Sequence, residues 1–83
     1  MSCFVYIIYS VFLDQYYIGS SEDIAARLFR HNNSGSKATK KASDWRIVYS
    51  EEFATRSEAL EREFEIKRKK SRRYIEYLIS IAG

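Results

Sequence analysis

The sequence predicts an α+β fold in which one small sheet is covered by helices, with the element order β-β-α-β-α-α. Three segments are rich in β-branched and aromatic residues, whereas three others repeat apolar residues at helical spacing. The 83 residues fit one domain, which we place at 1–83, and they contain no internal repeat. The hydrophobic fraction of 46% and the aromatic fraction of 16% are too high for a disordered chain.

The N-terminal segments predict a β-hairpin followed by a helix. Residues 3–10 are β-branched and aromatic, residues 15–20 repeat this character, and a polar turn lies between them. Ser20 or Ser21 is expected to cap the helix, because a hydroxyl oxygen can accept a hydrogen bond from an unpaired backbone N–H group of the first turn. The helix is expected to run to about Asn32.

Two polar side chains lie at the edge of the apolar stripe of this helix. At about 100° per residue, Ile24, Ala25 and Leu28 form one stripe. Arg27 and His31 lie along its rim rather than on the opposite face. Charged side chains that only face solvent would lie on the side of the helix opposite the apolar stripe. We therefore expect Arg27 and His31 to face a polar group.

A long loop and a third strand follow. Residues 33–44 are rich in Ser and Lys, and a loop of this length in so small a domain indicates a functional or mobile segment. Residues 45–53 then predict a strand that most simply joins the sheet of the hairpin. One face of this strand would carry Trp45, Ile47 and Tyr49, and the other face would carry Val48.

The second helix, opened by Thr55 or Ser57, carries an acid on its predicted buried face. Its apolar stripe on the helical wheel comprises Ala59, Leu60, Phe64 and Ile66. Glu63 falls inside this stripe, where a carboxylate is costly unless it meets a cation, a metal or strong donors. A salt bridge to Lys67, four residues on, is an alternative explanation and is compatible with a metal-binding role.

A third helix is expected over Arg72 to Ile81, capped by Ser71. Basic residues gather in two blocks, although the net charge is only +3. The candidate nucleic-acid contacts in these blocks are Lys37, Lys40, Lys41, Lys67, Lys69, Lys70, Arg72 and Arg73. The blocks indicate a polyanionic partner, and the alternative is a solvated charge run that keeps the protein soluble.

The single cysteine, Cys3, excludes an intrachain disulfide and a Cys-rich zinc site, and we expect it to be a small buried hydrophobe. The apolar run over residues 3–13 is too short to span a bilayer and has no basic leader. These features predict a soluble cytoplasmic protein.

Five short motifs follow one another at compatible spacings over residues 4–70. They are Phe4-Val5-Tyr6, Tyr17-Ile18-Gly19, Asp23-Ile24-x-x-Arg27-Leu28-x-x-His31-Asn32, Trp45-x-Ile47-Val48-Tyr49 and Ser57-Glu58-Ala59-Leu60-x-x-Glu63-x-x-Ile66-Lys67. Together they resemble the GIY-YIG nuclease domain, and most closely its small stand-alone bacterial members. The resemblance implies a three-stranded antiparallel sheet flanked by helices, and a divalent-cation-dependent phosphodiesterase acting on DNA in the cytoplasm or at the bacterial nucleoid.

The same resemblance implies catalytic roles for five residues. Tyr6 and Tyr17 correspond to the tyrosines of the first and second motifs, and Arg27 to the arginine of the first helix. His31 occupies a place filled by His or Tyr, and Glu63 corresponds to the metal-binding glutamate.

The sequence also departs from the family pattern. The first motif reads Phe-Val-Tyr instead of Gly-Ile-Tyr, and this change also occurs in the stand-alone members of the family. Ser20 stands where DNA-repair members often carry Lys, so one positive contact is missing. An asparagine that some members place after the second helix has no match near Ile75.

The residue types suit phosphodiester hydrolysis. Glu63 can hold a Mg²⁺ or Mn²⁺ ion that keeps its waters and takes a phosphate oxygen, and the planar fork of Arg27 fits a phosphate. Tyr6 or Tyr17 could serve as the base once nearby positive charge stabilises its phenolate, and we favour Tyr17 while the choice stays open.

We therefore predict a metal-dependent DNA endonuclease without strong sequence specificity. One alternative is a nucleic-acid-binding module of the same fold with little or no catalysis. Another is a protein-interaction domain, whose affinity for DNA would hardly fall as salt rises.

Overall fold

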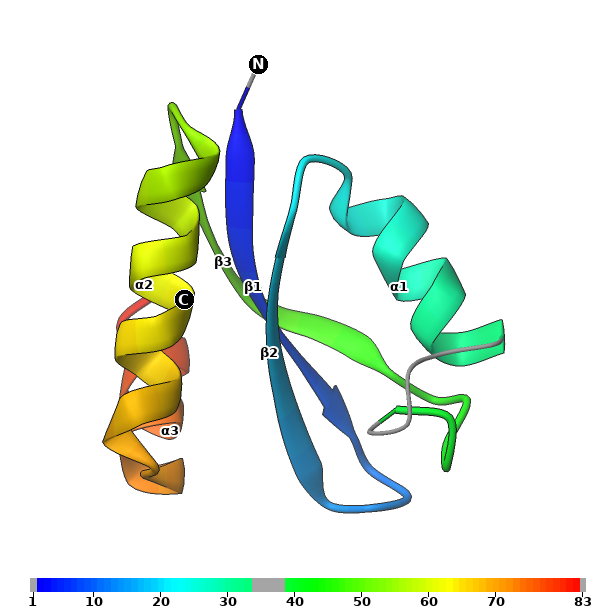
Figure 1. Ribbon diagram of the computed structural model, residues 1–83. Coiled ribbons are helices and arrows are strands. Elements are labelled where there is room, and N and C mark those ends of the chain that lie inside the picture. Colours follow the sequence, from blue (N-terminus) through cyan, green and yellow to red (C-terminus); the bar gives the residue numbers. More distant parts are fainter. Residues whose placement is uncertain (1, 34–38, 83) are drawn as a thin grey trace.

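The computed structural model describes residues 2–33 and 39–82. Its elements in chain order are β1 (Cys3–Ser10), β2 (Gln15–Ser21), α1 (Ile24–Asn33), β3 (Arg46–Phe53), α2 (Arg56–Lys69) and α3 (Arg72–Ala82). The predicted order β-β-α-β-α-α and the α+β fold are confirmed (Figure 1). No helix within these two ranges is long and apolar enough to cross a bilayer.

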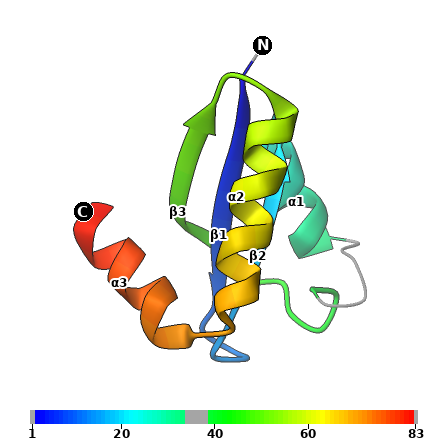
Figure 2. The same cartoon turned by 60° about the vertical axis from the view of Figure 1, so that its left-hand side comes forward.

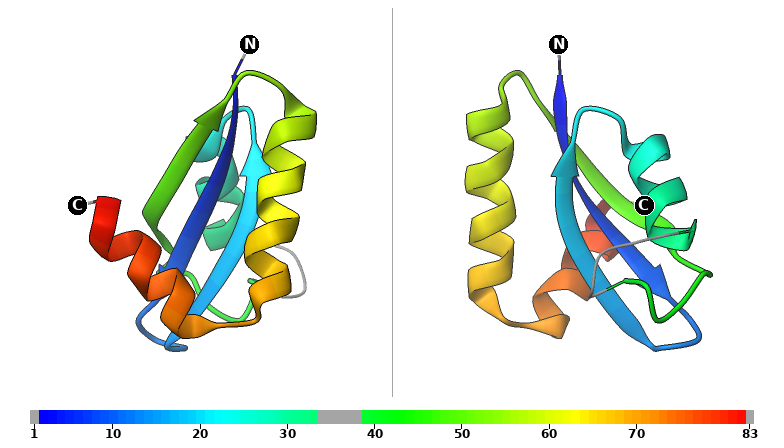
Figure 3. Two further views of the ribbon diagram at one scale, coloured as in Figure 1. Left: turned by 90° about the vertical axis from the view of Figure 1, so that its left-hand side faces the viewer. Right: turned by 45° about the vertical axis from the view of Figure 1, so that its right-hand side comes forward.

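The sheet is three-stranded and antiparallel, with the order β2-β1-β3. The central strand β1 pairs with both neighbours, so β2 is an edge strand of the described sheet. Helix α1 covers one face, while α2 and α3 cover the other (Figures 1 and 3). After α2, the chain turns so that α3 runs back toward β3 (Figure 2).

The alternation of side chains along β1 builds a core on each face of the sheet. The core beneath α2 and α3 contains the buried residues Cys3, Val5, Ile7, Ile18, Ala59, Ile66 and Leu78. The core beneath α1 contains Tyr6, Ile8 and Trp45, with Tyr17 and Leu28 packed against it. The predicted burial of Cys3 is confirmed, since the residue is only 4% exposed.

The predicted alternation of β3 is wrong because this strand contains a β-bulge. Tyr49 lies opposite Ile7, but the next residue of β1, Ile8, lies opposite Ile47, so Val48 is extra. A bulge of this kind interrupts the two-residue period of a strand. Val48 and Tyr49 consequently both pack against the core beneath α2 and α3, and Trp45 lies in the other core.

The N-cap of α1 also differs from the prediction. The carboxylate of Asp23 accepts from the backbone N–H of Ala26 at 3.0 Å, which is the contact that a capping side chain makes. Ser21 instead accepts from the backbone N–H of Asp23 at 3.1 Å. The Ser20 hydroxyl donates to Glu63, so it too is engaged elsewhere.

The caps of α2 and α3 are confirmed. Thr55 accepts from the backbone N–H of Glu58, whose side chain reaches back to the backbone N–H of Thr55, so the two form a capping box. The C-cap of α2 is Lys70, whose φ of 48° is left-handed. Ser71 then accepts from the backbone N–H of Tyr74 at 3.1 Å and caps α3.

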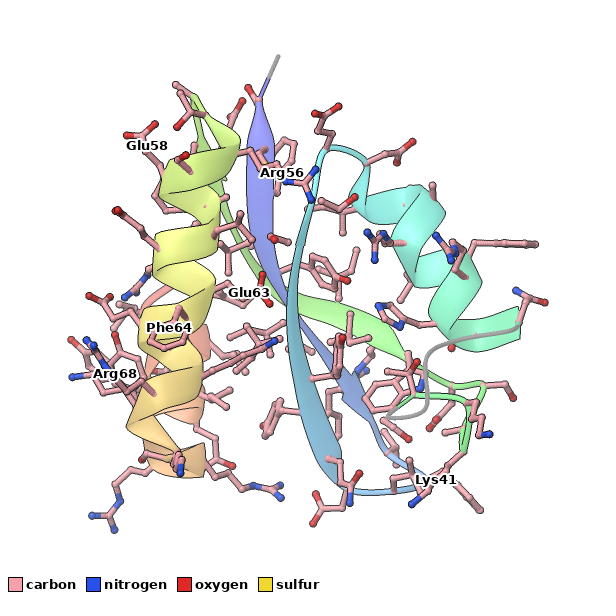
Figure 4. All side chains as sticks on the ribbon, viewed as in Figure 1. Lys41, Arg56, Glu58, Glu63, Phe64 and Arg68 are labelled. Carbon is pink, nitrogen blue, oxygen red and sulfur yellow. The ribbon has the colours of Figure 1, made fainter. Side chains whose placement is uncertain are left out.

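Helix α2 is rotated about its axis relative to the prediction. Ala59 and Ile66 are buried, but Leu60 is 46% and Phe64 is 65% exposed. The face of α2 toward the sheet is therefore centred on Ala59 and Ile66, and Phe64 lies outside it beside Arg68 (Figure 4).

The rotation brings Arg62 toward the sheet, where it joins three elements. Its Nε and Nη2 atoms donate to Glu51 of β3 at 3.1 Å, and its Nη1 atom donates to the Tyr74 hydroxyl of α3 at 3.2 Å. Burial raises the pKa of Glu51, but the hydrogen bonds from Arg62 and Tyr49 outweigh it, so this pKa lies below its ordinary value. Helical periodicity alone gave no sign of this network.

Candidate active site

Tyr6 and Gly19 make a close approach at the centre of the candidate site. They are register partners in the β1–β2 pair. A Cβ atom built on Gly19 would lie 2.5 Å from the Tyr6 hydroxyl oxygen and 2.7 Å from its Cζ atom. The absence of a side chain on Gly19 therefore lets the Tyr6 ring lie over β2, where it is almost fully buried.

Tyr6 is hydrogen-bonded to His31, the last buried side chain of α1. The hydroxyl of Tyr6 lies 2.9 Å from Nε2 of His31, and Nδ1 lies 2.9 Å from Oγ1 of the buried Thr39. Burial lowers the pKa of His31, and the charges of Arg27 and Arg30 lower it further, so the imidazole is neutral at pH 7.

The proton positions follow from the state of Tyr6. Burial, more than any other cause, raises the pKa of Tyr6 to about 12, so its hydroxyl keeps its proton. The charge of Arg27 lowers this pKa, whereas Tyr17 and Glu63 raise it, so these three groups all act on the Tyr6 hydroxyl. A neutral imidazole has one N–H, so we assign Tyr6 as donor to Nε2 of His31 and Nδ1–H as donor to the Thr39 hydroxyl.

Of the two side chains of α1 that were expected at the rim of its apolar stripe, one is buried and the other is exposed. His31 is 5% exposed and packs into the core rather than along the rim, whereas Arg27 is exposed. The predicted stripe is also too wide, because Ala25 is exposed while Ile24 and Leu28 are half-buried. At the C-terminal end of α1, His31 contacts Tyr6 of β1 and the Tyr17 ring of β2.

Tyr17 lies between α1 and α2 at the edge strand. Its ring centroid is 5.0 Å from that of His31. On the other side, Nζ of Lys67 lies 5.8 Å from the centre of the Tyr17 ring. Tyr17 thus has a neutral imidazole on one side and an ammonium group on the other.

Glu63 reaches the same edge strand from the opposite face of the sheet. Its side chain is 17% exposed, and its Oε1 atom accepts from the Ser20 hydroxyl at 2.6 Å. Its Oε2 atom accepts from Nζ of Lys67 at 2.7 Å. Figure 4 shows Glu63 extending from α2 toward the sheet. The carboxylate directed at the sheet and the alternative salt bridge to Lys67 are thus both present.

The candidate site wraps around β2. Tyr6 and Tyr17 belong to the face covered by α1, whereas Glu63 and Lys67 come from α2 on the other face. The edge position of β2 is what lets groups from the two faces approach each other, because no further strand of the described sheet covers it.

Glu63 is the carboxylate at this site that could hold a metal ion. No group of three or more His, Cys, Asp or Glu side chains in the described residues could hold a metal. A closed zinc site needs about four such ligands, whereas Mg²⁺ binds through one or two carboxylates, waters and substrate phosphates. A single carboxylate such as that of Glu63 fits the second kind of ion, although the ammonium group of Lys67 now contacts it.

The first basic block lies beside α1. Lys40 and Lys41 are exposed and line a recess together with His31 and Asn32. Lys37, which the sequence also assigned to this block, lies outside the described residues.

The second block is divided between ion pairs and free surface. Arg72 donates to Asp14 at 2.6 Å and to Glu76 at 3.3 Å, so its charge is partly compensated. Nζ of Lys69 lies 5.3 Å from the centre of the Tyr74 ring. Lys70 and Arg73 are exposed.

Three supporting residues were missed by sequence reasoning. Thr39 carries no motif, and Ser20 was considered as a cap and as a position where other members carry Lys, but not as a partner of Glu63. Asn32 holds the end of α1 against the start of β3, because its side chain accepts from the backbone N–H of Trp45 at 2.7 Å and donates to its carbonyl at 3.0 Å. Only Asn32 had a signal, as it follows His31 in the third motif.

Comparison with known proteins gives a consistent result. A family model described as the GIY-YIG catalytic domain matches residues 2–75. UPF0213 proteins of Staphylococcus epidermidis and Staphylococcus saprophyticus are 48% and 50% identical over 52 residues, which is 61% of this chain. The match spans 63% of the length of these relatives, less than two thirds.

A solved structure is also similar. The solution NMR structure of a UPF0213 protein from Bacillus halodurans has a TM-score of 0.63 and 32% sequence identity. The alignment covers 100% of this chain and 87% of that one.

Proposed function

Since this chain belongs to the GIY-YIG catalytic domain family, a family of nucleases, we propose that it is a divalent-metal-dependent endonuclease that hydrolyses DNA phosphodiester bonds. The observation that supports this most directly is that His31 from one face of the sheet and Glu63 from the other both contact β2, the edge strand that carries Tyr17.

Glu63 would hold Mg²⁺ or Mn²⁺. Bound there, the ion would stabilise the charge that develops on the phosphate oxygens. The ammonium of Lys67 contacts the same carboxylate, so Lys67 and the ion would compete for it. The Ser20 hydroxyl would keep the carboxylate oriented through its hydrogen bond to Oε1.

Tyr17 is our candidate for the general base. Tyr6 is less suited because its pKa of about 12 lies far above neutral pH and its proton is engaged with His31. We assign Tyr6 and His31 to positioning, since the chain of contacts from Tyr6 through His31 to Thr39 fixes the ring against which Tyr17 packs.

Arg27 would bind the phosphate. Its guanidinium is exposed on α1 and close enough to act on the Tyr6 hydroxyl. The planar fork of an arginine matches two phosphate oxygens, and its charge would offset the negative charge that grows in the transition state.

The test is nicking of supercoiled plasmid DNA in Mg²⁺ or Mn²⁺. We expect Glu63→Gln to lower the rate by about 100-fold or more, because the substitution removes the carboxylate charge while keeping its shape. Glu61→Gln is the matched control, since Glu61 is an exposed acid of the same helix, and it should stay within about twofold. Chelation with EDTA should abolish nicking. Nicking that survives both Glu63→Gln and EDTA would refute the proposal.

A second candidate is a nucleic-acid-binding module with little or no catalysis. The observation that favours it is the Glu63–Lys67 ion pair, which already neutralises the proposed metal ligand. This candidate predicts that the protein binds DNA but leaves it intact in both metals.

A further inference from the structure

A second concave surface continues from the candidate site along the same edge strand. It has a volume of about 370 Å³, at the lower end of the range for small-ligand pockets. We call it the β2 groove. Its floor is apolar, and its lining residues come mainly from β2, the C-terminal half of α2 and the start of α3. Its lining includes Ile18, Ile66 and Ile75 on the floor, and Lys67, Lys70 and Arg72 on the rim.

The rim of the β2 groove carries more positive than negative charge. Asp14 is the acid among its lining residues, and it is ion-paired with Arg72. Lys70 is exposed at the left-handed C-cap of α2. Lys67 lies on the rim and contacts Glu63, but an ammonium group has three donors, so Lys67 can also contact a second anion. The rim is therefore complementary to an anion such as a phosphate.

Lys67 also connects the groove to the candidate site. Glu63, Lys67 and Lys70 follow one another along α2, and a rise of about 1.5 Å per residue places Lys70 about 10 Å beyond Glu63. On β2, the Ser20 contact of Glu63 and the groove residue Ile18 follow in the same direction. A nucleic-acid strand with one phosphate at Glu63 would thus continue along β2 into the groove.

We propose that the β2 groove holds one unpaired nucleotide next to the phosphate that is cleaved, a proposal that rests on the nuclease function. The base lies on the apolar floor, and its phosphate lies between Lys67 and Lys70. Apolar and aromatic surfaces bind the faces of bases without reading sequence. Farther from Glu63, Cζ of Arg72 lies 5.1 Å from the centre of the Tyr16 ring, and both residues line the groove.

The proposal specifies a class of substrate. A base in a duplex is stacked on both sides and paired, so it reaches a recessed floor only after unstacking, which costs energy. Single-stranded DNA, or a duplex with an unpaired end, presents a free base without this cost. The β2 groove therefore selects unpaired nucleotides beside the cleavage site.

Methyl NMR spectroscopy of the full chain, with EDTA present to prevent cleavage, tests this occupancy. The probes are tetrathymidylate, the same tetramer without bases, and a blunt duplex at equal nucleotide concentration. We expect tetrathymidylate to shift the Ile18 and Ile75 methyl signals and to give NOEs between Ile75 and thymine. Absence of these NOEs, or equal shifts with the baseless tetramer or the duplex, would overturn the proposal.

Two variants distinguish binding in the β2 groove from nonspecific electrostatic attraction to the protein. Lys70→Gly removes one rim cation and suits the left-handed C-cap, so it should weaken tetrathymidylate binding about threefold to fivefold without unfolding the helix. Arg68→Ala removes an equal charge from the same end of α2, beside Phe64 and outside the groove lining, and should change affinity less than about 1.5-fold. Equal losses of affinity in the two variants would refute the nucleotide site in the β2 groove.

The plasmid-nicking assay separates this proposal from the nuclease function. Metal-dependent nicking that needs Glu63, without any response of the groove methyls, would overturn the groove and support the nuclease. Groove NOEs from a strand that is never cut would support the nucleotide site and overturn the nuclease.

Discussion

At the scale of single residues, Gly19 and His31 determine whether the tyrosines can meet the other groups of the site. The Tyr6 ring occupies the space that a side chain on Gly19 would need. His31 then ties the Tyr6 hydroxyl to Thr39 through its two ring nitrogens. Gly19 thus avoids a steric clash with Tyr6, and the hydrogen bonds of His31 fix the orientation of its imidazole ring.

Gly19→Ala should destabilise the protein. The added methyl group would meet the buried Tyr6 ring 2.5 Å from its hydroxyl oxygen, so we expect a loss of about 1–3 kcal/mol in the free energy of unfolding. Urea denaturation measures this loss. Gln15→Ala, at an exposed position of the same strand, is the control and should cost less than about 0.5 kcal/mol. Equal stability of the two variants would mean that the close approach of Tyr6 to β2 is not a constraint.

His31 should make stability depend on pH. Its pKa is lowered in the folded protein, whereas an unfolded chain has the ordinary value of about 6.5. Between these two values only the unfolded chain binds the proton, so the free energy of unfolding should fall as pH decreases below about 6.5. The acids with lowered pKa, Asp14, Asp44 and Glu51, act in the same direction only closer to their ordinary range near 4.

Two measurements check the role of His31. Because the sequence contains one histidine, an NMR titration of its ring protons reports its pKa directly. A value at or above 6.5 would contradict the prediction. Urea denaturation at pH 7.5 and 5.5 should show a smaller pH effect in His31→Gln than in the wild type.

At the scale of elements, the rotation of α2 and the edge position of β2 make the site possible. Helix α2 presents Ala59 and Ile66 to the sheet, which brings Glu63 to the β2 edge and leaves Phe64 in solvent. Had α2 been centred on the predicted stripe, the carboxylate of Glu63 would have faced the apolar core. The observed rotation leaves it at the boundary, where a hydroxyl and an ammonium group can reach it.

A pair of substitutions on α2 tests this rotation. Ile66→Ala should lower the free energy of unfolding by about 2–5 kcal/mol, because Ile66 is 1% exposed and its loss leaves a cavity. Phe64→Ala should cost less than about 1 kcal/mol, because the larger side chain is mostly in solvent. Urea denaturation of both variants is sufficient. A larger loss for Phe64→Ala would contradict the orientation of α2.

At the scale of the whole molecule, basic groups lie on both sides of the β2 edge. Lys40 and Lys41 line the recess beside α1, and Lys67 and Lys70 line the groove beside α2. Their distribution matters more than the net charge of +3, since acids elsewhere in the chain balance much of the total. A nucleic-acid strand that crosses the candidate site would meet cations on either side of it.

Binding of single-stranded DNA should therefore depend strongly on salt. Each phosphate contact contributes a slope of about −0.7 to the plot of log affinity against log salt. If Lys40 and Lys41 each neutralise one phosphate, the double substitution to Ala should reduce the steepness by about 1.4. Fluorescence anisotropy in EDTA provides the measurement. An affinity that does not change with salt would refute phosphate binding and favour a protein-interaction domain.

Local sequence patterns were sufficient for the elements of this protein and for part of its site. Strand and helix periodicity predicted all six elements in order, and the Thr55 and Ser71 caps were found because capping involves neighbours in the chain. The helical wheels also singled out Arg27, His31 and Glu63. The bulge at Val48 could not be found in this way, because it arises from pairing with β1.

What the sequence determined by itself was the order of the strands and helices and which residues lie close together around a helix. Only the tertiary structure decided how each helix is turned toward the sheet, and hence that His31 is buried against Tyr6 while Phe64 is left in solvent. The physical reason is that periodicity depends on backbone geometry within a few residues. The rotation of a helix depends instead on the total burial and hydrogen bonding that it achieves against strands distant in sequence.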